Sequence, residues 1–164
     1  ISGINNAGNL GDDVLYSGTV GAAMEGRFLD LPAIAVSLAG DDPVYFDTAG
    51  NVVRELLEKL LKIPLSARTI LNINVPNVPR DQIKGWDATR LGGRGQALPT
   101  TKEVDPVGKD IYWIGDAGAE LDAGPGTDFY AIAHGRVSIT PLTADMTDRT
   151  RLSEVDKWLG GAPK

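Results

Sequence analysis

The sequence predicts an α/β fold built around a parallel sheet. Three features indicate it: an apolar run without alternation at residues 31–38, an amphipathic helix on each side of that run, and a second strand-like segment at 69–75. A strand that helices cover on both faces has no polar face, so it is a continuous apolar run in the sequence. The alternation of helices and strands in this half of the chain is typical of βαβ units.

The first elements are a strand end and a helix. Residues 1–4 have the composition of the end of a buried strand, and because the chain starts with Ile1 rather than methionine we expect an earlier part to be missing. A helix from about Ser17 to Phe28 follows, since apolar residues recur there at spacings of three, four and eight. The face predicted to be buried holds Val20, Ala23, Met24 and Phe28.

A longer helix is predicted between the two strand segments. Asp47 or Thr48 can cap its start, and it ends before Pro64, where a proline stops the helix. Its apolar positions are Val52, Val53, Leu56, Leu57, Leu60 and Leu61. The strand at 69–75 should alternate, with Leu71, Ile73 and Val75 on one face and Ile70, Asn72 and Asn74 on the other.

The pattern changes after Pro76 to short strands separated by glycine and proline turns. We predict an antiparallel region with strands at 86–91, 111–114, 128–133 and 136–141. Residues 92–109 have no packing period, which favours a protruding arm or an ordered loop. A last amphipathic helix carries Leu152, Val155, Trp158 and Leu159. The chain therefore divides into a core at 1–76, antiparallel strands with an arm at 77–142, and a helix and tail at 143–164.

Composition excludes several classes of partner. The net charge is −6 with a pI near 4.7, whereas a nucleic-acid backbone or an anionic membrane requires a basic surface. The absence of cysteine excludes disulfides and thiolate chemistry, which fits a cytoplasmic protein. No apolar run is long enough to span a membrane.

A small anion site is predicted in residues 1–28. Asn5, Asn6 and Asn9 offer side-chain amides in a glycine-bearing loop, and Ser17-Gly18-Thr19 opens the following helix. Free N–H groups at a helix N-terminus favour phosphate. Both readings of Ser17-Gly18-Thr19 stay open at this point: a plain helix cap and a phosphate site.

Other polar residues have competing interpretations. Gly8-Asn9-Leu10-Gly11 lacks the first part of a dinucleotide fingerprint, and no Gly-Lys-Ser/Thr of a P-loop follows. Asp12-Asp13 could ligate a metal, but we favour a cap or turn. His134 could be a general acid or base, but a hairpin turn between two strands is the favoured interpretation.

The same question arises for buried or turn residues later in the chain. Residues 124–128, Gly-Pro-Gly-Thr-Asp, either form a capped turn or bring Thr127 and Asp128 to a ligand. Asn72 and Asn74 are polar on a strand that should be buried, so they require hydrogen-bond partners inside the protein. We favour a structural polar network over substrate contact.

Several of these segments together resemble the survival protein SurE family. The similar segments include Ser-Gly-Ile-Asn at 2–5, Tyr-Ser-Gly-Thr-Val at 16–20, Pro-Ala-Ile-Ala-Val-Ser at 32–37, Asn-Ile-Asn-Val-Pro at 72–76, Asp-Ala-Gly-Pro-Gly-Thr-Asp at 122–128 and Val-Ser-Ile-Thr-Pro-Leu at 137–142. They occur in the same order over nearly all of the chain.

The resemblance implies a metal-dependent nucleotidase that hydrolyses nucleoside 5′- and 3′-monophosphates. It implies a Rossmann-like three-layer core, a hairpin arm and an exchanged C-terminal tail that build a homodimer or homotetramer. In this chain Asn5 matches the family's asparagine ligand of Mg²⁺ or Mn²⁺, and Asn9 matches a second, catalytic-site asparagine. Ser17, Gly18 and Thr19 match the segment that holds the phosphate.

The chain also departs from the family pattern. The family's N-terminal Asn-Asp-Asp-Gly motif and a later serine ligand have no counterpart here, and Arg149 stands where relatives can have a histidine. We therefore expect this chain to be inactive in isolation, with an open sheet edge and exposed apolar helix faces. The alternative function is a non-catalytic oligomerisation or nucleotide-binding fragment. A dinucleotide-dependent oxidoreductase is disfavoured because its glycine fingerprint is absent.

Overall fold

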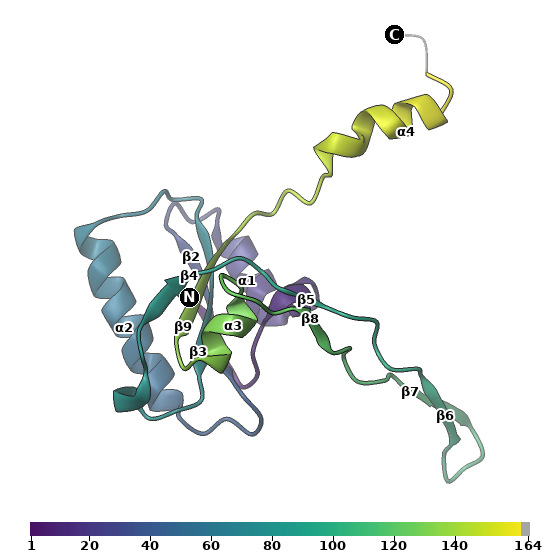
Figure 1. The fold of residues 1–164 in the computed structure, drawn as a ribbon, viewed down its shortest axis with the longest axis horizontal. Helices are drawn as coiled ribbons and strands as arrows, with labels where there is room; N and C mark the ends of the chain where they lie inside the picture. Colours follow the sequence, from purple (N-terminus) through teal and green to yellow (C-terminus); the bar gives the residue numbers. More distant parts are fainter. Residues whose placement is uncertain (162–164) are drawn as a thin grey trace.

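A five-stranded mixed sheet forms the centre of the molecule in the computed structural model, which describes residues 1–161 (Figure 1). The order across the sheet is β1 (Ser2–Asn5), β2 (Ala33–Ala39), β3 (Ile70–Pro76), β9 (Val137–Leu142) and β4 (Trp86–Ala88). The strands β1, β2 and β3 are parallel, β9 is antiparallel to β3, and β4 is parallel to β9. The predicted parallel core with antiparallel additions is thus present.

The two central strands are buried along their whole length, as their apolar sequences predict. On one face, Leu71, Ile73 and Val75 of β3 join the larger core cluster. On the other face, Ile70 belongs to a smaller cluster, and Asn72 and Asn74 lie beside it in the alternating pattern. The predicted division of the faces of β3 is confirmed.

Helices α1 (Gly18–Gly26) and α2 (Phe46–Lys62) pack on opposite faces of the sheet (Figure 1). Val20 and Ala23 of α1 are buried, but Phe28 is 66% exposed, so its predicted place in the core is wrong. The reason is that α1 ends at Gly26, which leaves Phe28 outside the helix and under the guanidinium of Arg27. None of the helices in the described part of the chain is long and apolar enough to cross a membrane.

The start of α2 differs from the predicted cap. The helix begins at Phe46, and neither Asp47 nor Thr48 caps it. The Thr48 hydroxyl instead donates to the carbonyl of Val78 at 3.0 Å, while the side-chain oxygen of Asn77 accepts two N–H groups just before the helix, at 2.9 and 3.2 Å. The loop after β3 therefore holds the chain that enters α2, and no side chain caps the helix itself.

The strand predicted at 128–133 is wrong, because this segment is the short helix α3 (Asp128–Ala133). The hydroxyl of Thr127 accepts the N–H of Tyr130 at 3.1 Å and caps the helix. His134 is the C-terminal cap residue, and its ring stacks on Tyr130 with 3.8 Å between the ring centroids. The hairpin turn predicted at His134 is therefore wrong as well.

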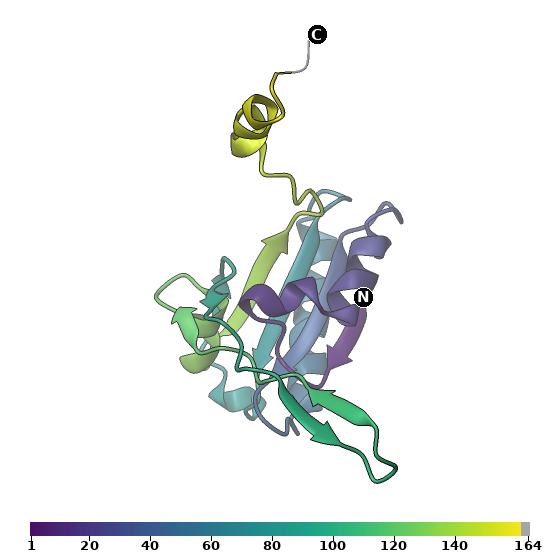
Figure 2. The ribbon, with the colours of Figure 1, turned by 90° about the vertical axis from the view of Figure 1, so that its right-hand side faces the viewer.

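An arm extends away from the sheet, as Figure 2 shows. It consists of two antiparallel strand pairs: β5 (Gly93–Arg94) with β8 (Glu120–Asp122), and β6 (Thr101–Val104) with β7 (Asp110–Trp113). The arm is longer than the predicted range of 92–109, because its returning strands lie at 110–122. Val104, Tyr112 and Trp113 near its end are exposed.

Helix α4 (Leu152–Trp158) stands apart from the sheet at the C-terminal end (Figures 1 and 2). The predicted helix is present, and all four of its predicted apolar positions are exposed: Leu152, Val155, Trp158 and Leu159. Three short 3₁₀ helices complete the described elements: η1 (Gly11–Leu15), η2 (Arg80–Gln82) and η3 (Arg149–Arg151).

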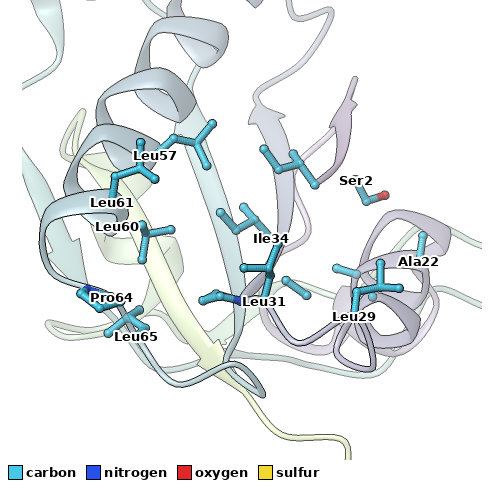
Figure 3. A pocket seen from close by; sticks show the side chains of 15 residues that line it. Ser2, Ala22, Leu29, Leu31, Ile34, Leu57, Leu60, Leu61, Pro64 and Leu65 are labelled. Atoms are coloured by element: carbon cyan, nitrogen blue, oxygen red, sulfur yellow. The ribbon is translucent and has the colours of Figure 1, made fainter.

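An apolar groove of about 730 Å³ opens beside β1, between the last turns of α1 and α2 (Figure 3). Leu29, Leu31, Leu57, Leu61 and Leu65 line it with other apolar side chains. The strand β1 has one neighbour, β2, within the described sheet. The groove and the strand edge match the expected open sheet edge and exposed helix faces.

An ion pair joins Asp87 of β4 to Arg136, the residue just before β9. Arg136 donates from Nε to Asp87 Oδ2 at 2.7 Å and from Nη2 to Oδ1 at 2.8 Å, and its Nη1 donates to the carbonyl of Lys84 at 2.9 Å. The hydrogen bonds from Arg136, with its positive charge, hold the pKa of Asp87 below its usual value.

This lowered pKa predicts how stability depends on pH. Because the folded protein binds the Asp87 proton more weakly than the unfolded chain, the pair stabilises the fold above the unfolded pKa of about 3.9, and this contribution is lost as the pH falls below that value. We expect Asp87→Asn to lower the free energy of unfolding at pH 7, and the difference from the parent protein to shrink below about pH 3. Urea titrations at both pH values test this, with the exposed Asp81→Asn as control. A difference that is the same at both pH values contradicts the prediction.

Candidate phosphate and metal site

All predicted site residues lie between the last residue of β1 and the first turn of α1. The segment leaves the sheet at Asn5, passes through η1 and enters α1 after Ser17. In open α/β sheets, ligands bind beyond the carboxyl ends of the parallel strands. Asn5 is the last residue of β1 and pairs with Ser37 of β2, so it lies at this end of the sheet.

Ser17 is the N-cap of α1, as predicted. Its Oγ accepts the N–H of Val20 at 3.1 Å. The N–H groups of Gly18 and Thr19 have no acceptor within residues 1–161, and a side chain added at Gly18 would meet nothing within 4 Å. The first turn of α1 is therefore open to solvent with two free donors, and the helix dipole favours an anion there.

The side chain of Asn5 has a fixed orientation with one free oxygen. Its Nδ2 donates to the carbonyl of Ala7 at 2.8 Å, which leaves Oδ1 without a donor in the described part of the chain. A neutral amide oxygen is a ligand that Mg²⁺ and Mn²⁺ accept. Asn5 thus fits as one ligand of such a cation. Within residues 1–161, no three His, Asp or Glu side chains converge into a metal site.

Asn9 points into the protein rather than toward the start of α1. It is 4% exposed, and its Nδ2 donates to Oγ of Ser37 at 2.6 Å. Its main-chain N–H donates to Oδ1 of Asn74 at 2.8 Å, and its carbonyl accepts from Nδ2 of Asn72 at 2.8 Å and of Asn74 at 3.0 Å. The predicted structural polar network of Asn72 and Asn74 is confirmed, and its partner is Asn9.

Asp12 and Asp13 have structural contacts, as favoured, but they bind Arg94, and neither side chain caps η1. Oδ2 of Asp13 lies 3.2 Å from Nη2 of Arg94, and Oδ2 of Asp12 accepts the main-chain N–H of Arg94 at 3.3 Å. These contacts join η1 to the base of the arm. The guanidinium of Arg94 also lies 4.8 Å from the centre of the Phe129 ring.

Asp128 joins segments that lie far apart in the sequence, and the sequence left its role open. Its carboxylate is fully buried and accepts the N–H groups of Gly11 at 2.7 Å, of Gly92 at 2.8 Å and of Phe129 at 3.0 Å. It thereby joins the site segment, the base of the arm and α3. The Thr-Asp pair after Gly-Pro-Gly is the sequence signal of this helix start, but it does not reveal the two distant partners.

A second ion pair lies at the base of the arm. Arg90 donates through both Nη atoms to the carboxylate of Asp122, with Nη2 and Oδ1 2.9 Å apart. These hydrogen bonds from a cation hold the pKa of Asp122 below its usual value. Both side chains are more than half exposed, so this pair adds little to stability, and the buried Asp128 is the stronger link to the base of the arm.

The fold and the site define the class: an α/β protein with an open sheet, whose first strand ends in an amide-bearing loop that leads to an open helix N-terminus. The family model described as survival protein SurE matches residues 1–97. Because the match covers more than half of the chain, the protein belongs to the survival protein SurE family.

Individual relatives agree with this assignment. The chain is 58% identical over 164 residues to a protein of Nitrosococcus oceani named 5′-nucleotidase SurE, and 57% identical over 161 residues to one of Halorhodospira halophila with the same name. The two alignments include 100% and 98% of this chain. They cover only 65% and 64% of the relatives' length, so the chain spans about two thirds of each relative.

A solved structure confirms the fold. The SurE protein of Aquifex aeolicus superposes with a TM-score of 0.79 at 39% identity, over 96% of this chain and 63% of that one. The predicted α/β class with a Rossmann-like core is therefore confirmed.

Proposed function

We propose that the protein is a 5′-nucleotidase that hydrolyses nucleoside monophosphates to nucleoside and phosphate, and that it acts on 3′-monophosphates as well. The observation that carries the proposal is the open first turn of α1, with two free N–H donors on the segment that carries Asn5. Such a turn accepts the dianionic phosphate of a monoester. The name 5′-nucleotidase, which the relatives from N. oceani and H. halophila carry, supports the substrate class.

Each site residue has a proposed role in this reaction. Ser17 fixes the start of α1 and so directs the N–H groups of Gly18 and Thr19 at the phosphate oxygens. The hydroxyl of Thr19 adds a further donor. Asn5 presents Oδ1 to a divalent cation, Mg²⁺ or Mn²⁺, and Asn9 holds the loop of Asn5 in place. When bound, the cation would neutralise charge on the phosphate and lower the pKa of a water ligand.

We also propose that the protein works as a homodimer or homotetramer in the cytoplasm. The exposed apolar side chains on the arm and on α4 support assembly, since soluble monomers rarely present such patches. They also support the alternative function, a non-catalytic oligomerisation or nucleotide-binding fragment. Binding of AMP without release of phosphate would favour that alternative.

Replacement of Asn5 by alanine tests the proposed reaction. The assay uses the protein with the family's N-terminal Asn-Asp-Asp-Gly segment included, because this chain alone is expected to be inactive. In that protein we expect Mn²⁺-dependent phosphate release from AMP and GMP to fall at least about tenfold, because a ligand of the cation is lost. The assay is repeated with a chelator, which should abolish release by the parent protein.

The matched control is Asn51→Ala, which removes an asparagine whose amide donates to the carbonyl of Asp47 on α2, away from the site. This variant should retain parent activity. Full activity of Asn5→Ala, or release of phosphate that the chelator leaves unchanged, would contradict the proposal.

A further inference from the structure

We propose that Asn72 and Asn74 of β3 are positioning residues for the reaction: their buried side-chain amides hold the main chain of Asn9 and so fix the loop that carries Asn5. The site loop is defined here as residues 5–11. The inference rests on the proposed function, because Asn5 matters as a cation ligand only if the reaction requires the cation. Neither asparagine touches substrate in this proposal.

Asn74 binds the main chain of Asn9 in both directions. Its Oδ1 accepts the N–H of Asn9 at 2.8 Å, and its Nδ2 donates to the carbonyl of the same residue at 3.0 Å. The side-chain amide of Asn74 thus pairs with both main-chain groups of Asn9, as a neighbouring strand would in a sheet. Asn72 adds a second donor to the same carbonyl at 2.8 Å.

These contacts leave the site loop little freedom. At one end Asn5 is in register with Ser37 of β2, and at the other the N–H of Gly11 donates to the buried carboxylate of Asp128 at 2.7 Å. Asn9 lies between these two points and is held by three main-chain hydrogen bonds. The position of Asn5 relative to the start of α1 therefore depends on β3.

The hydrogen bonding of Asn72 shows that the pair serves the site loop rather than the sheet. Both asparagines are fully buried, where an amide without partners is unfavourable. The Oδ1 atom of Asn72 has no partner in the described part of the chain, so the bond from its Nδ2 to the carbonyl of Asn9 is the one hydrogen bond of this side chain there. Ile70 lies on the same face of β3 and is packed in the smaller core cluster, so this face of the strand accepts an apolar residue.

The test compares Asn74→Ala with Ile73→Val in the protein that releases phosphate from AMP. Ile73 is the intervening residue, fully buried on the opposite face, so its variant weakens the same strand without touching the loop. We expect Asn74→Ala to lower kcat about tenfold, with a change in KM below about twofold, because a misplaced cation ligand acts mainly in the transition state. Ile73→Val should keep the parent kcat at a comparable melting temperature.

A second variant and a second measurement keep the test decisive. Asn72→Ala removes one hydrogen bond where Asn74→Ala removes two, so it should fold if the other does not, and we expect kcat to fall about threefold. Mn²⁺ alone should broaden the NMR signal of the Asn5 side-chain amide in the parent protein, and do so more weakly in Asn74→Ala.

The outcomes separate this inference from the proposed function. Parent-like kcat in both asparagine variants overturns the positioning role and leaves the nucleotidase proposal intact. If the parent protein releases no phosphate, the proposed function fails. The broadening of the Asn5 signal by Mn²⁺ then decides whether Asn74 positions Asn5. Equal broadening in the parent protein and in Asn74→Ala, or none in either, overturns the positioning role.

Discussion

Replacement of Asp128 by alanine should lower the free energy of unfolding by about 4 kcal/mol, a large part of the 5–15 kcal/mol typical of a domain. The carboxylate is fully buried and accepts N–H groups from three separate segments, at Gly11, Gly92 and Phe129. Each donor left without a partner costs about 1–3 kcal/mol, and bonds to a charged acceptor are at the strong end. Urea denaturation followed by far-ultraviolet circular dichroism measures the loss.

The matched control for this prediction is Asp110→Ala on the arm. Asp110 also has a cationic partner, with Nζ of Lys102 at 2.7 Å, but its side chain is 51% exposed. An exposed pair contributes about 0–1 kcal/mol, so this variant should unfold nearly as the parent does. Equal losses in the two variants would show that Asp128 does not join the three segments in solution. Asp128→Asn should lie between them, since it keeps the shape but turns one acceptor into a donor.

Replacement of Gly92 by alanine should be nearly as damaging, for a steric reason. A Cβ at this position would overlap both the carbonyl oxygen of Asp122 and the ring of Phe129. Phe129 is only 2% exposed, and the atom of Asp122 that the Cβ would meet belongs to the main chain, so neither can move aside freely. Overpacking of a buried site costs about 1–3 kcal/mol and sometimes more, and we expect the upper part of that range.

Gly93→Ala provides the control for Gly92→Ala. The two glycines are adjacent, but at Gly93 the nearest atom to an added Cβ would be Cβ of Asp122 at 3.7 Å, an ordinary contact. The melting temperature of Gly93→Ala should stay close to that of the parent, while that of Gly92→Ala should fall by several degrees. Similar melting temperatures for the two variants would contradict the packing of Phe129 against the base of the arm.

The sequence predicted the central elements because their periodicity reflects burial. The apolar run of β2 and the alternation of β3 follow directly from which faces helices cover. The helix at 128–133 was missed because six residues are too few to show a helical period, and because the buried Phe129 and Ala131 alternate as they would in a strand. The cap from Thr127 and the hydrogen bonds of Asp128 to Gly11 and Gly92 stabilise this helix instead.

The candidate site was predictable to a different extent. Ser17 could be identified as a cap because the signal is local, and the need of Asn72 and Asn74 for buried partners follows from their position on a covered strand. That the partner is the main chain of Asn9 could not be foreseen, since the residues lie more than 60 positions apart. The orientation of a loop depends on such distant contacts, and the sequence of a loop has no periodicity from which that orientation could be predicted.

The separation of the sheet, the arm and α4 also divides the intrinsic fluorescence of the molecule. The chain has three tryptophans, and each belongs to a different part: Trp86 is partly buried in β4, Trp113 is 58% exposed on the arm, and Trp158 is 82% exposed on α4. A change of emission confined to one of them therefore locates the event. Contact through the arm shifts Trp113, contact through the last helix shifts Trp158, and loss of the folded sheet shifts Trp86.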